Sequence, residues 1–394
     1  MSTPNRTAAR PVAMQFVLLI GVVSLFSDLT HEGARSISGP YLATLGASAL
    51  VVAGVAGFGE LLGYALRFVF GWAADRTGRY WPITLIGYLV QMAAVPLLAL
   101  AGSWPTAAAL IATERTGRAI RNPPRDAMLA HAATTVGRGW VFGVREALDA
   151  VGGMLGPLAV ALVLWLHGGY RLSFALLAIP ALLCIAVLAR AWRRYPQPAE
   201  LENAPAPTAR TRIPPAFWCF LLAMGLVGLG YADYPLIAFR LDTDHVVGPD
   251  LIPVLYAAAM AAEALAALAL GRLFDRYGMP TLVGATLLTA AFGPLVFLGT
   301  APLVVLGVIC WGIGMAAQES IVKAVVTGLV DPRRRAFAFG LFDTGFGVFW
   351  FAGSLLLGLL YDTSVTGLVT LTIVAQLAAI PMFLLTSRLR RTAV

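Results

Sequence analysis

Charged residues are scarce in this sequence. Only 12% of the 394 residues are charged, 59% are hydrophobic and the mean hydropathy is +0.80, whereas about 25% of residues are charged in an ordinary soluble domain. The composition therefore excludes an ordinary soluble protein. The net charge is +8, with Lys323 as the only lysine. The arginines gather at the ends of apolar runs, so the positive-inside rule explains this charge, and we expect no nucleic-acid partner.

Cysteine is also rare, and nucleotide-binding and catalytic motifs are absent. Cys184, Cys219 and Cys310 lie within or at the edge of apolar runs without C-x-x-C spacing, which argues against a disulfide framework or a metal site. No G-x-x-x-x-G-K-[ST] loop is present, which excludes an ATP-driven pump within this chain. No catalytic triad is apparent. We expect neither an enzyme nor a bound cofactor or metal.

Long apolar runs dominate the chain, each of about 20 residues and long enough to cross a hydrocarbon core of about 30 Å. The arginine-rich segments between them alternate with arginine-poor ones, which predicts that both termini are cytoplasmic. We therefore expect an all-α, multi-pass monomer of twelve transmembrane helices in the inner (cytoplasmic) membrane. The runs lie near residues 12–38, 48–71, 81–101, 105–131, 138–166, 171–190, 215–240, 250–271, 280–299, 302–329, 336–361 and 366–387.

The chain contains an internal repeat. The stretch Gly71–Gly78 recurs as Gly271–Gly278, both with the pattern G-x-x-x-D-R-x-G, and Arg138–Glu146 recurs as Arg335–Asp343. Such a repeat predicts two pseudo-symmetric six-helix halves. The segment around 195–215 is rich in Pro, Ala and Glu and is the one linker candidate. The predicted parts are a cytoplasmic tail (1–11), an N-terminal half (12–190), a cytoplasmic linker (191–214), a C-terminal half (215–387) and a cytoplasmic tail (388–394).

These motifs resemble those of the major facilitator superfamily. The repeated G-x-x-x-D-R-x-G resembles its signature loop; the first copy extends to Arg79, whereas the second has Met279 there. Gly152-x-x-x-Gly156-Pro157 resembles a motif of the superfamily's proton-coupled exporters. Arg115 stands where the fourth span usually has an arginine, although the Gln and Gly that normally follow it are missing. The resemblance implies the major facilitator fold and secondary active transport.

The resemblance also implies a cytoplasmic gate. In the family the signature loop stabilises the outward-facing state, so Asp75, Arg79 and Asp126 are candidates for a charged latch. Gly78 permits a tight turn with positive φ, and Gly71 permits two helices to approach closely. The alternative is that these charges only fix the topology. The full predicted gate comprises Gly71, Asp75, Arg76, Gly78, Arg79, Arg121, Arg125, Asp126, Gly271, Asp275, Arg276, Gly278 and Lys323.

Small residues on the fifth span predict close helix packing. Gly152 and Gly156 form a small-residue stripe, and Pro157 adds a bend, which suits packing against a neighbour from the other half. A general packing motif explains the same residues without any exporter-specific role.

Acidic residues at membrane depth predict proton coupling. Asp28, His31, Glu32 and Arg35 fall within an arc of about 100° on the first span. Apolar surroundings disfavour a charged carboxylate and a nearby guanidinium favours it, so Asp28 and Glu32 are poised to gain and lose a proton. The alternative is an internal salt bridge that holds the first span in the bundle. The predicted proton-coupling residues are Asp28, Glu32, Asp149, Glu60 and Glu263.

Arginines of the fourth span predict a substrate contact. Arg115, Arg118, Arg121 and Arg125 lie within about 120° of one helix face, and Arg115 and Arg118 are at membrane depth. A bidentate guanidinium suits a carboxylate or phosphate, although the balance of acidic and basic charges favours internal pairing. The predicted substrate-binding residues are Arg35, Arg115, Arg118, Arg145, Glu146, Tyr234, Glu319 and Asp343. Asp233-Tyr234-Pro235 also predicts a hinge with an exposed polar group.

We therefore predict a proton-coupled secondary active transporter that exports a small organic molecule by alternating access, in exchange for protons. Its expected partners are this substrate, protons and membrane lipid. One alternative is a proton-coupled importer of an organic anion. Another is a membrane receptor or scaffold without transport activity.

Overall fold

A computed structural model describes residues 6–136, 138–196, 213–330 and 335–391. Within these ranges every regular element is a helix, because a helix satisfies all its backbone hydrogen bonds internally and therefore tolerates hydrocarbon. The predicted all-α fold is confirmed. Most of the predicted linker and the extreme ends of both predicted tails lie outside the described residues, and α1 begins at Arg6, inside the predicted N-terminal tail.

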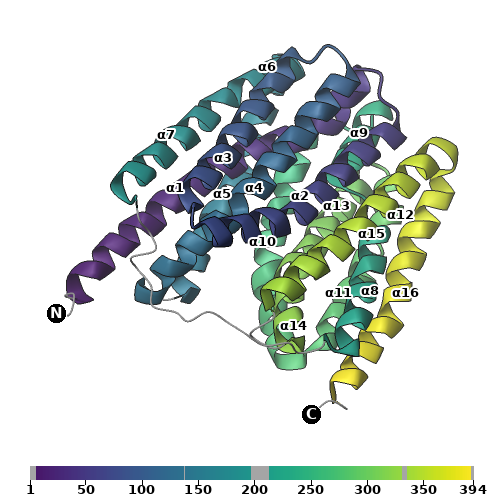
Figure 1. Cartoon of the computed structure of the whole chain (residues 1–394). Helices are drawn as coiled ribbons and strands as arrows, with labels where there is room; N and C mark the ends of the chain where they lie inside the picture. Colours follow the sequence, from purple (N-terminus) through teal and green to yellow (C-terminus); the bar gives the residue numbers. More distant parts are fainter. Residues whose placement is uncertain (1–5, 137, 197–212, 331–334, 392–394) are drawn as a thin grey trace. The chain divides into compact units, whose positions relative to one another are not determined.

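In the described part of the chain, seven α-helices and one short 3-10 turn precede the linker, and Figure 1 shows their arrangement. They are α1 (Arg6–Thr44), α2 (Ala49–Thr77), α3 (Tyr80–Leu97) with its extension η1 (Leu98–Leu100), α4 (Trp104–Val136), α5 (Arg138–Trp165), α6 (Gly169–Leu176) and α7 (Ala178–Arg194). α6 and α7 together form the sixth span.

The spans after the linker are more often interrupted. α8 (Pro215–Leu229) and α9 (Tyr234–Thr243) form the seventh span, and α11 (Met279–Thr289) and α12 (Phe292–Phe297) the ninth. The tenth span contains a π-helical turn, η3 (Ala317–Ile321), between α13 (Ala301–Ala316) and α14 (Val322–Leu329). The uninterrupted spans are α10 (Leu251–Tyr277), α15 (Arg335–Thr363) and α16 (Val365–Arg391).

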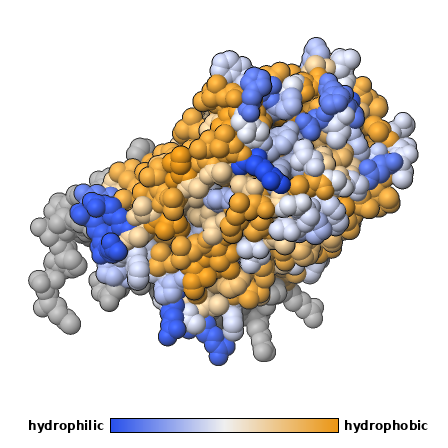
Figure 2. Space-filling model, turned by 90° about the horizontal axis from the view of Figure 1, so that it is seen from above, coloured by the Kyte–Doolittle hydropathy of each residue, from blue (hydrophilic) through white to orange (hydrophobic). Residues whose placement is uncertain are grey.

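Eleven segments of the described chain are long and apolar enough to cross a membrane. The twelfth span is α4, whose 33 residues suffice in length but whose arginines and carboxylates lower its hydropathy. Large apolar side chains such as Leu100, Leu182 and Leu265 are more than two-thirds exposed, and hydrophobic residues cover much of the face in Figure 2. Such a surface suits lipid rather than water.

The contacts divide the chain into two compact units. Unit 1 comprises residues 1–34 and 66–206, and unit 2 comprises residues 35–65 and 207–394. The boundary falls inside α1, between Ala34 and Arg35, and inside α2. This grouping reflects contacts and not the sequence repeat, so the boundaries of the two predicted halves stay a prediction. The apolar core of unit 1 lies mainly between α1, α3 and α7, around Phe16, Tyr88 and Leu188.

Candidate functional site

Two glycines bring α3 and α4 of unit 1 into backbone contact. A Cβ on Gly117 would lie 2.6 Å from the backbone nitrogen of Gln91, and a Cβ on Gly87 would lie 2.7 Å from that of Arg121. Only glycine allows so close an approach. As a result, the side chain of Gln91, in the middle of an apolar helix, faces the charged side of α4.

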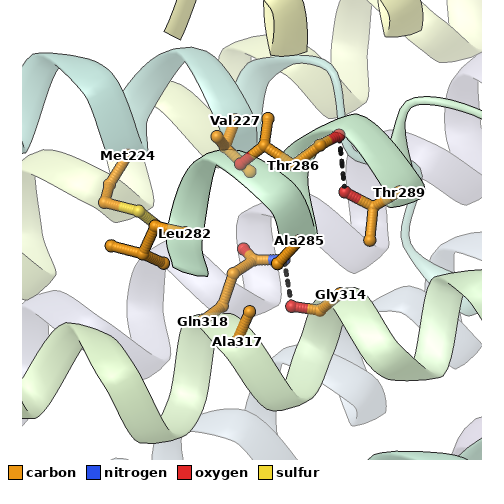
Figure 3. A pocket seen from close by; sticks show the side chains of 9 residues that line it. All are labelled: Met224, Val227, Leu282, Ala285, Thr286, Thr289, Gly314, Ala317 and Gln318. Carbon is orange, nitrogen blue, oxygen red and sulfur yellow. Dashed lines mark hydrogen bonds between the residues drawn. The ribbon is translucent and has the colours of Figure 1, made fainter. Parts of the chain in front are cut away.

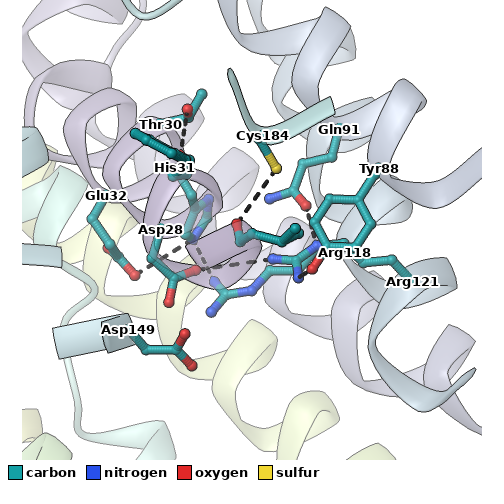
Figure 4. A network of polar contacts seen from close by, with 12 residues as sticks. Asp28, Thr30, His31, Glu32, Tyr88, Gln91, Arg118, Arg121, Asp149 and Cys184 are labelled. Atoms are coloured by element: carbon teal, nitrogen blue, oxygen red, sulfur yellow. Dashed lines mark hydrogen bonds and ion pairs between the residues drawn. The ribbon is translucent and has the colours of Figure 1, made fainter. Parts of the chain in front are cut away.

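Polar side chains of α1, α3 and α4 meet in a buried group (Figure 4). We call it the unit 1 cluster and define it as Asp28, His31, Glu32, Tyr88, Gln91, Glu114, Arg115, Arg118 and Arg121. Glu114 lies at its centre. One carboxylate oxygen is 2.8 Å from Nδ1 of His31 and accepts a 2.7 Å hydrogen bond from Nε2 of Gln91, and the other oxygen is 3.6 Å from Nε of Arg115.

The second ring nitrogen of His31 faces cations and one acid. Arg118 hydrogen-bonds to Nε2, and NH1 of Arg115 is 3.4 Å away from it. The carboxylate of Glu32 lies 3.7 Å from the same nitrogen. The sequence placed His31 on the same helix face as Asp28 and Glu32 but assigned it no role. The structure brings Arg115 and Arg118, both predicted substrate contacts, directly against it.

Arg121 belongs to this cluster, although the sequence placed it in the gate. Its guanidinium donates to Oε1 of Gln91 and, at 2.9 Å, to the hydroxyl of Tyr88, and it lies 4.4 Å from the centre of the Tyr88 ring. It is also 3.9 Å from the carboxylate of Asp28. Tyr88 and Gln91 are three residues apart and so share a helix face. That spacing is the signal that could have identified them as partners.

A chain of ion pairs connects α4 to α5. Arg125 contacts Asp126 at 2.8 Å, Arg145 lies 4.0 Å from the same carboxylate, and Arg145 also contacts Asp149 at 2.7 Å. Asp149, a predicted proton-coupling residue, is close enough to Asp28 to interact electrostatically (Figure 4). These ion pairs therefore connect residues predicted for the gate (Arg125 and Asp126) with a predicted substrate contact (Arg145) and a predicted proton-coupling acid (Asp149).

The predicted gate loops have the expected turns. Gly78 and Gly278 have φ of +64° and +68°, which glycine adopts without strain. A Cβ on Gly71 would lie 3.3 Å from Pro123, whereas nothing lies within 4 Å of that position on Gly271, so only the first copy shows a close approach. The charged residues described in the loops, Arg76, Arg79, Asp275 and Arg276, are exposed. The side chains of Asp75 and Lys323 lie outside the described residues.

The seventh span breaks where the sequence predicted a hinge. α8 ends at Leu229 and α9 begins at Tyr234, with Asp233 as its N-cap: the carboxylate accepts a 2.8 Å hydrogen bond from the backbone N–H of Tyr234. We had expected an exposed polar group at this hinge, but Asp233 is buried and only 2% accessible. Its charge is balanced by Arg35, whose NH2 lies 2.7 Å from Asp233 and 3.8 Å from Glu60.

Aromatic side chains surround this break in unit 2. The hydroxyl of Tyr234 donates to the carbonyl of Ile252 at 2.6 Å, and the indole N–H of Trp311 donates to that of Ala232 at 2.8 Å. Tyr231, Tyr256 and Trp311 form ring contacts with one another or with Tyr234. This aromatic group could not be predicted from the sequence, because its members come from three spans and share no spacing. Tyr234, a predicted substrate contact, is completely buried within it.

The remaining predicted site residues lie outside both groups. Glu263 on α10 is an electrostatic neighbour of Tyr231, Asp343 on α15 is half-buried, and Glu146 on α5 and Glu319 on η3 are exposed. Unit 2 also contains a small, mainly apolar cavity beside η3, with room for about one water molecule. Thr286, Thr289 and Gln318 line it (Figure 3).

The fifth span packs closely on α1. A Cβ on Gly156 would lie 2.9 Å from the backbone nitrogen of Gly33 and would overlap the carbonyl of Leu29, and one on Gly152 would overlap the carbonyl of Leu25. The predicted small-residue packing is therefore present. Its observed neighbour is the first span of the same half, whereas we had expected a span of the other half.

Replacing Gly156 by alanine is expected to lower the free energy of unfolding by about 1–3 kcal/mol, because the two backbones must separate to admit the methyl group. Gly153→Ala is the matched control: the nearest atom to its Cβ is Cγ of Glu32 at 3.7 Å, an ordinary contact, and alanine is the better helix former. Thermal unfolding of the purified variants measures both. Equal midpoints for the two variants would contradict the close packing of α5 on α1.

The chain matches known proteins over nearly its whole length. The family model of the Major Facilitator Superfamily matches residues 19–246 and 234–393. An uncharacterized protein of Mycobacterium tuberculosis is 41% identical over 384 residues, which cover 95% of this chain and 94% of the relative. An uncharacterized MFS-type transporter of Methanocaldococcus jannaschii is 25% identical over 358 residues, 88% of this chain and 89% of the relative.

A solved structure confirms the fold. The crystal structure of the nucleoside transporter NupG has a TM-score of 0.72 to this chain at 14% identity, and the match covers 95% of this chain and 98% of that one. Its identity is too low to bear on the substrate. With the family match and the helical membrane fold together, the chain belongs to the major facilitator superfamily and is a multi-pass membrane transporter.

Proposed function

We propose that this transporter is a proton-coupled secondary active transporter of a small organic molecule, and that the unit 1 cluster is where proton and substrate binding are linked. The observation that carries the proposal is the burial of acids, a histidine and arginines in direct contact within spans 1, 3 and 4. His31 and Glu114 are both about 95% buried or more; ionisable residues are costly to bury in a membrane protein, and those that occur there typically mark substrate or proton pathways. We place the protein in the cytoplasmic membrane with both termini inside.

Export in exchange for protons is the direction that the sequence favours. The preference for export rests on the Gly152–Pro157 motif and on a pair of neighbouring acids, Asp28 and Asp149. Asp28 also faces Arg121. A substrate that displaces a proton from such a pair moves opposite to it.

A specific contact supports the second candidate, proton-coupled import of an organic anion. Arg115 and Arg118 both reach one uncharged ring nitrogen, that of His31, and a guanidinium binds a carboxylate or phosphate far better than an imidazole. An anion that attracts these arginines would move together with any proton bound in the cluster.

Reconstituted vesicles test the function and separate the two directions. A thermal-shift screen of carboxylates, phosphates, siderophores and lipophilic cations first identifies a bound compound. An inward proton gradient is then imposed on vesicles that contain the protein. Exchange expels a preloaded compound, whereas import with protons accumulates an external one. If the gradient accelerates neither flux relative to protein-free vesicles for any compound that binds, the proposal is wrong.

A further inference from the structure

The ring of His31 is held by an acid on one nitrogen and by arginines on the other. Nδ1 is 2.8 Å from the carboxylate of Glu114, and a carboxylate only accepts hydrogen bonds, so Nδ1 carries a proton. Nε2 faces Arg118 and, at 3.4 Å, Arg115. A guanidinium has donors and no acceptor, so Nε2 accepts from it. His31 is therefore neutral in this arrangement.

A second proton on His31 and its contact with Arg118 exclude each other. The proton would have to bind Nε2, where it would point at the N–H groups of Arg118, and a guanidinium does not deprotonate in proteins. Arg118 must move away before Nε2 can be protonated. Once it has moved, the cluster already contains a partner for the new N–H, because the carboxylate of Glu32 lies 3.7 Å from Nε2. Protonated His31 would then have an acid at each nitrogen, Glu114 and Glu32.

The displaced arginine needs a negative partner. While His31 is neutral the formal charges of the unit 1 cluster balance, three acids (Asp28, Glu32 and Glu114) against three arginines, so a proton on His31 leaves one buried positive charge in excess, which is costly. Asp28 is already shared between Arg121, at 3.9 Å, and Arg118 as an electrostatic neighbour, and Asp149 is engaged by Arg145 at 2.7 Å. An anionic group of a substrate supplies the acceptor that Arg118 and Arg115 require.

From this geometry we infer that the substrate is an organic anion and that His31 is a proton switch that links its binding to the uptake of one proton. The anion draws Arg118, with Arg115, off Nε2, and Nε2 then binds a proton and faces Glu32. By linkage the reverse holds too: protonation of His31 strengthens anion binding. The inference rests on the proposed function and belongs to its second candidate, because a proton and an anion that bind together travel together.

Equilibrium binding in detergent tests the switch without any transport. Benzoate serves as the carboxylate probe, inorganic phosphate as the second anion and tetraphenylphosphonium as the cation for comparison. Calorimetry in two buffers of different ionisation enthalpy gives the number of protons taken up on binding. We expect about one proton per benzoate, and a benzoate Kd that rises up to about tenfold per pH unit between about pH 6 and 8. Tetraphenylphosphonium should show no proton uptake.

The variant His31→Gln should remove the linkage and keep the cluster. Its amide can donate to Glu114 and accept from Arg118 but cannot gain a proton, so proton uptake should fall to about zero and the benzoate Kd should become independent of pH. His31→Asn is the second variant, to be used if the His31→Gln protein does not fold. His245→Asn, at an exposed histidine, is the matched control and should keep the linkage.

Three results would overturn the inference. They are the absence of benzoate and phosphate binding, benzoate binding by the wild-type protein without proton uptake, and full proton uptake by His31→Gln. The first two need no variant. Proton-linked benzoate binding without gradient-driven flux in vesicles would instead refute the proposed function and leave the switch intact.

Discussion

Replacing Asp233 by alanine is expected to lower the free energy of unfolding by about 3–5 kcal/mol, the range measured when one partner of a buried ion pair is removed. The change takes from Arg35 a carboxylate at 2.7 Å, and both side chains are at most 9% exposed. It also removes the acceptor for the backbone N–H of Tyr234 at the first turn of α9, a cap that contributes roughly 1 kcal/mol. Thermal unfolding of the purified protein should show a lower midpoint.

Asp250→Ala is the matched control for this variant. Asp250 is the N-cap of α10, but its side chain makes no capping hydrogen bond, so its loss should change the midpoint little. The double variant Arg35→Met with Asp233→Ala adds a second check, because it removes both charges together. We expect it to be more stable than the sum of the two single changes predicts. Strict additivity would show that the ion pair does not hold α9 on α1.

The break in the seventh span could be predicted from the sequence, but the burial and pairing of the Asp233 carboxylate could not. Proline after a polar residue stops a helix for local reasons, and α9 does begin beside Pro235. Whether Asp233 faces solvent or a cation depends on the C-terminal part of α1. There Gly39 lets the backbones touch, since a Cβ on Gly39 would overlap the carbonyl of Pro235. The residue spacing within α1 and within α9 does not predict that these two helices are in contact.

The same limit applies to the contacts of Arg121. Helical periodicity correctly put Arg115, Arg118 and Arg121 on one side of α4, and a count of about 1.5 Å per residue then assigned Arg121 to the cytoplasmic end. Periodicity gives the face of a helix but not the helix opposite. The approach of α3 at Gly87 and Gly117 decides that Arg121 meets Gln91 and Tyr88.

A change of helix type also defeats spacing rules. Glu319 and Lys323 are four residues apart, which predicts a pair on one face of an α-helix. The π-helical turn of η3 spans Ala317–Ile321, and its wider hydrogen-bond spacing shifts the phase of the residues that follow. The i,i+4 rule of the α-helix therefore does not apply across η3, whereas the uninterrupted helix α4 carries Arg115, Arg118 and Arg121 on one face, as the sequence predicted.

Neutralising two acids of the first span is expected to abolish proton-driven transport. In Asp28→Asn with Glu32→Gln, the amides keep the size of the side chains but can neither gain nor lose a proton in the physiological range. Asp28 is the acid that faces Arg121, at 3.9 Å, and Glu32 is the acid nearest to Nε2 of His31, at 3.7 Å. Without Glu32, a proton on Nε2 of His31 lacks its carboxylate partner, and without Asp28 the cluster loses the acid that faces Arg121. We expect flux driven by a proton gradient to fall at least tenfold.

The loss must be separated from a loss of folding or of binding. The variant should therefore be compared with wild type for its thermal midpoint and for its affinity for the compound found in the screen. Asp250→Asn, outside both groups of charged residues, serves as the control for removal of one acid.

A folded, ligand-binding double variant that retains the wild-type number of protons per transported molecule would show that neither Asp28 nor Glu32 carries the coupling. The coupling would then lie with His31, which can still gain a proton in this variant, or with the remaining predicted acids: Asp149 beside Arg145 in unit 1, and Glu60 and Glu263 in unit 2. Because Glu60 shares Arg35 with Asp233, a coupling site there would also make transport sensitive to Asp233→Asn. Wild-type proton stoichiometry in that variant would leave His31, Asp149 and Glu263 as the candidates.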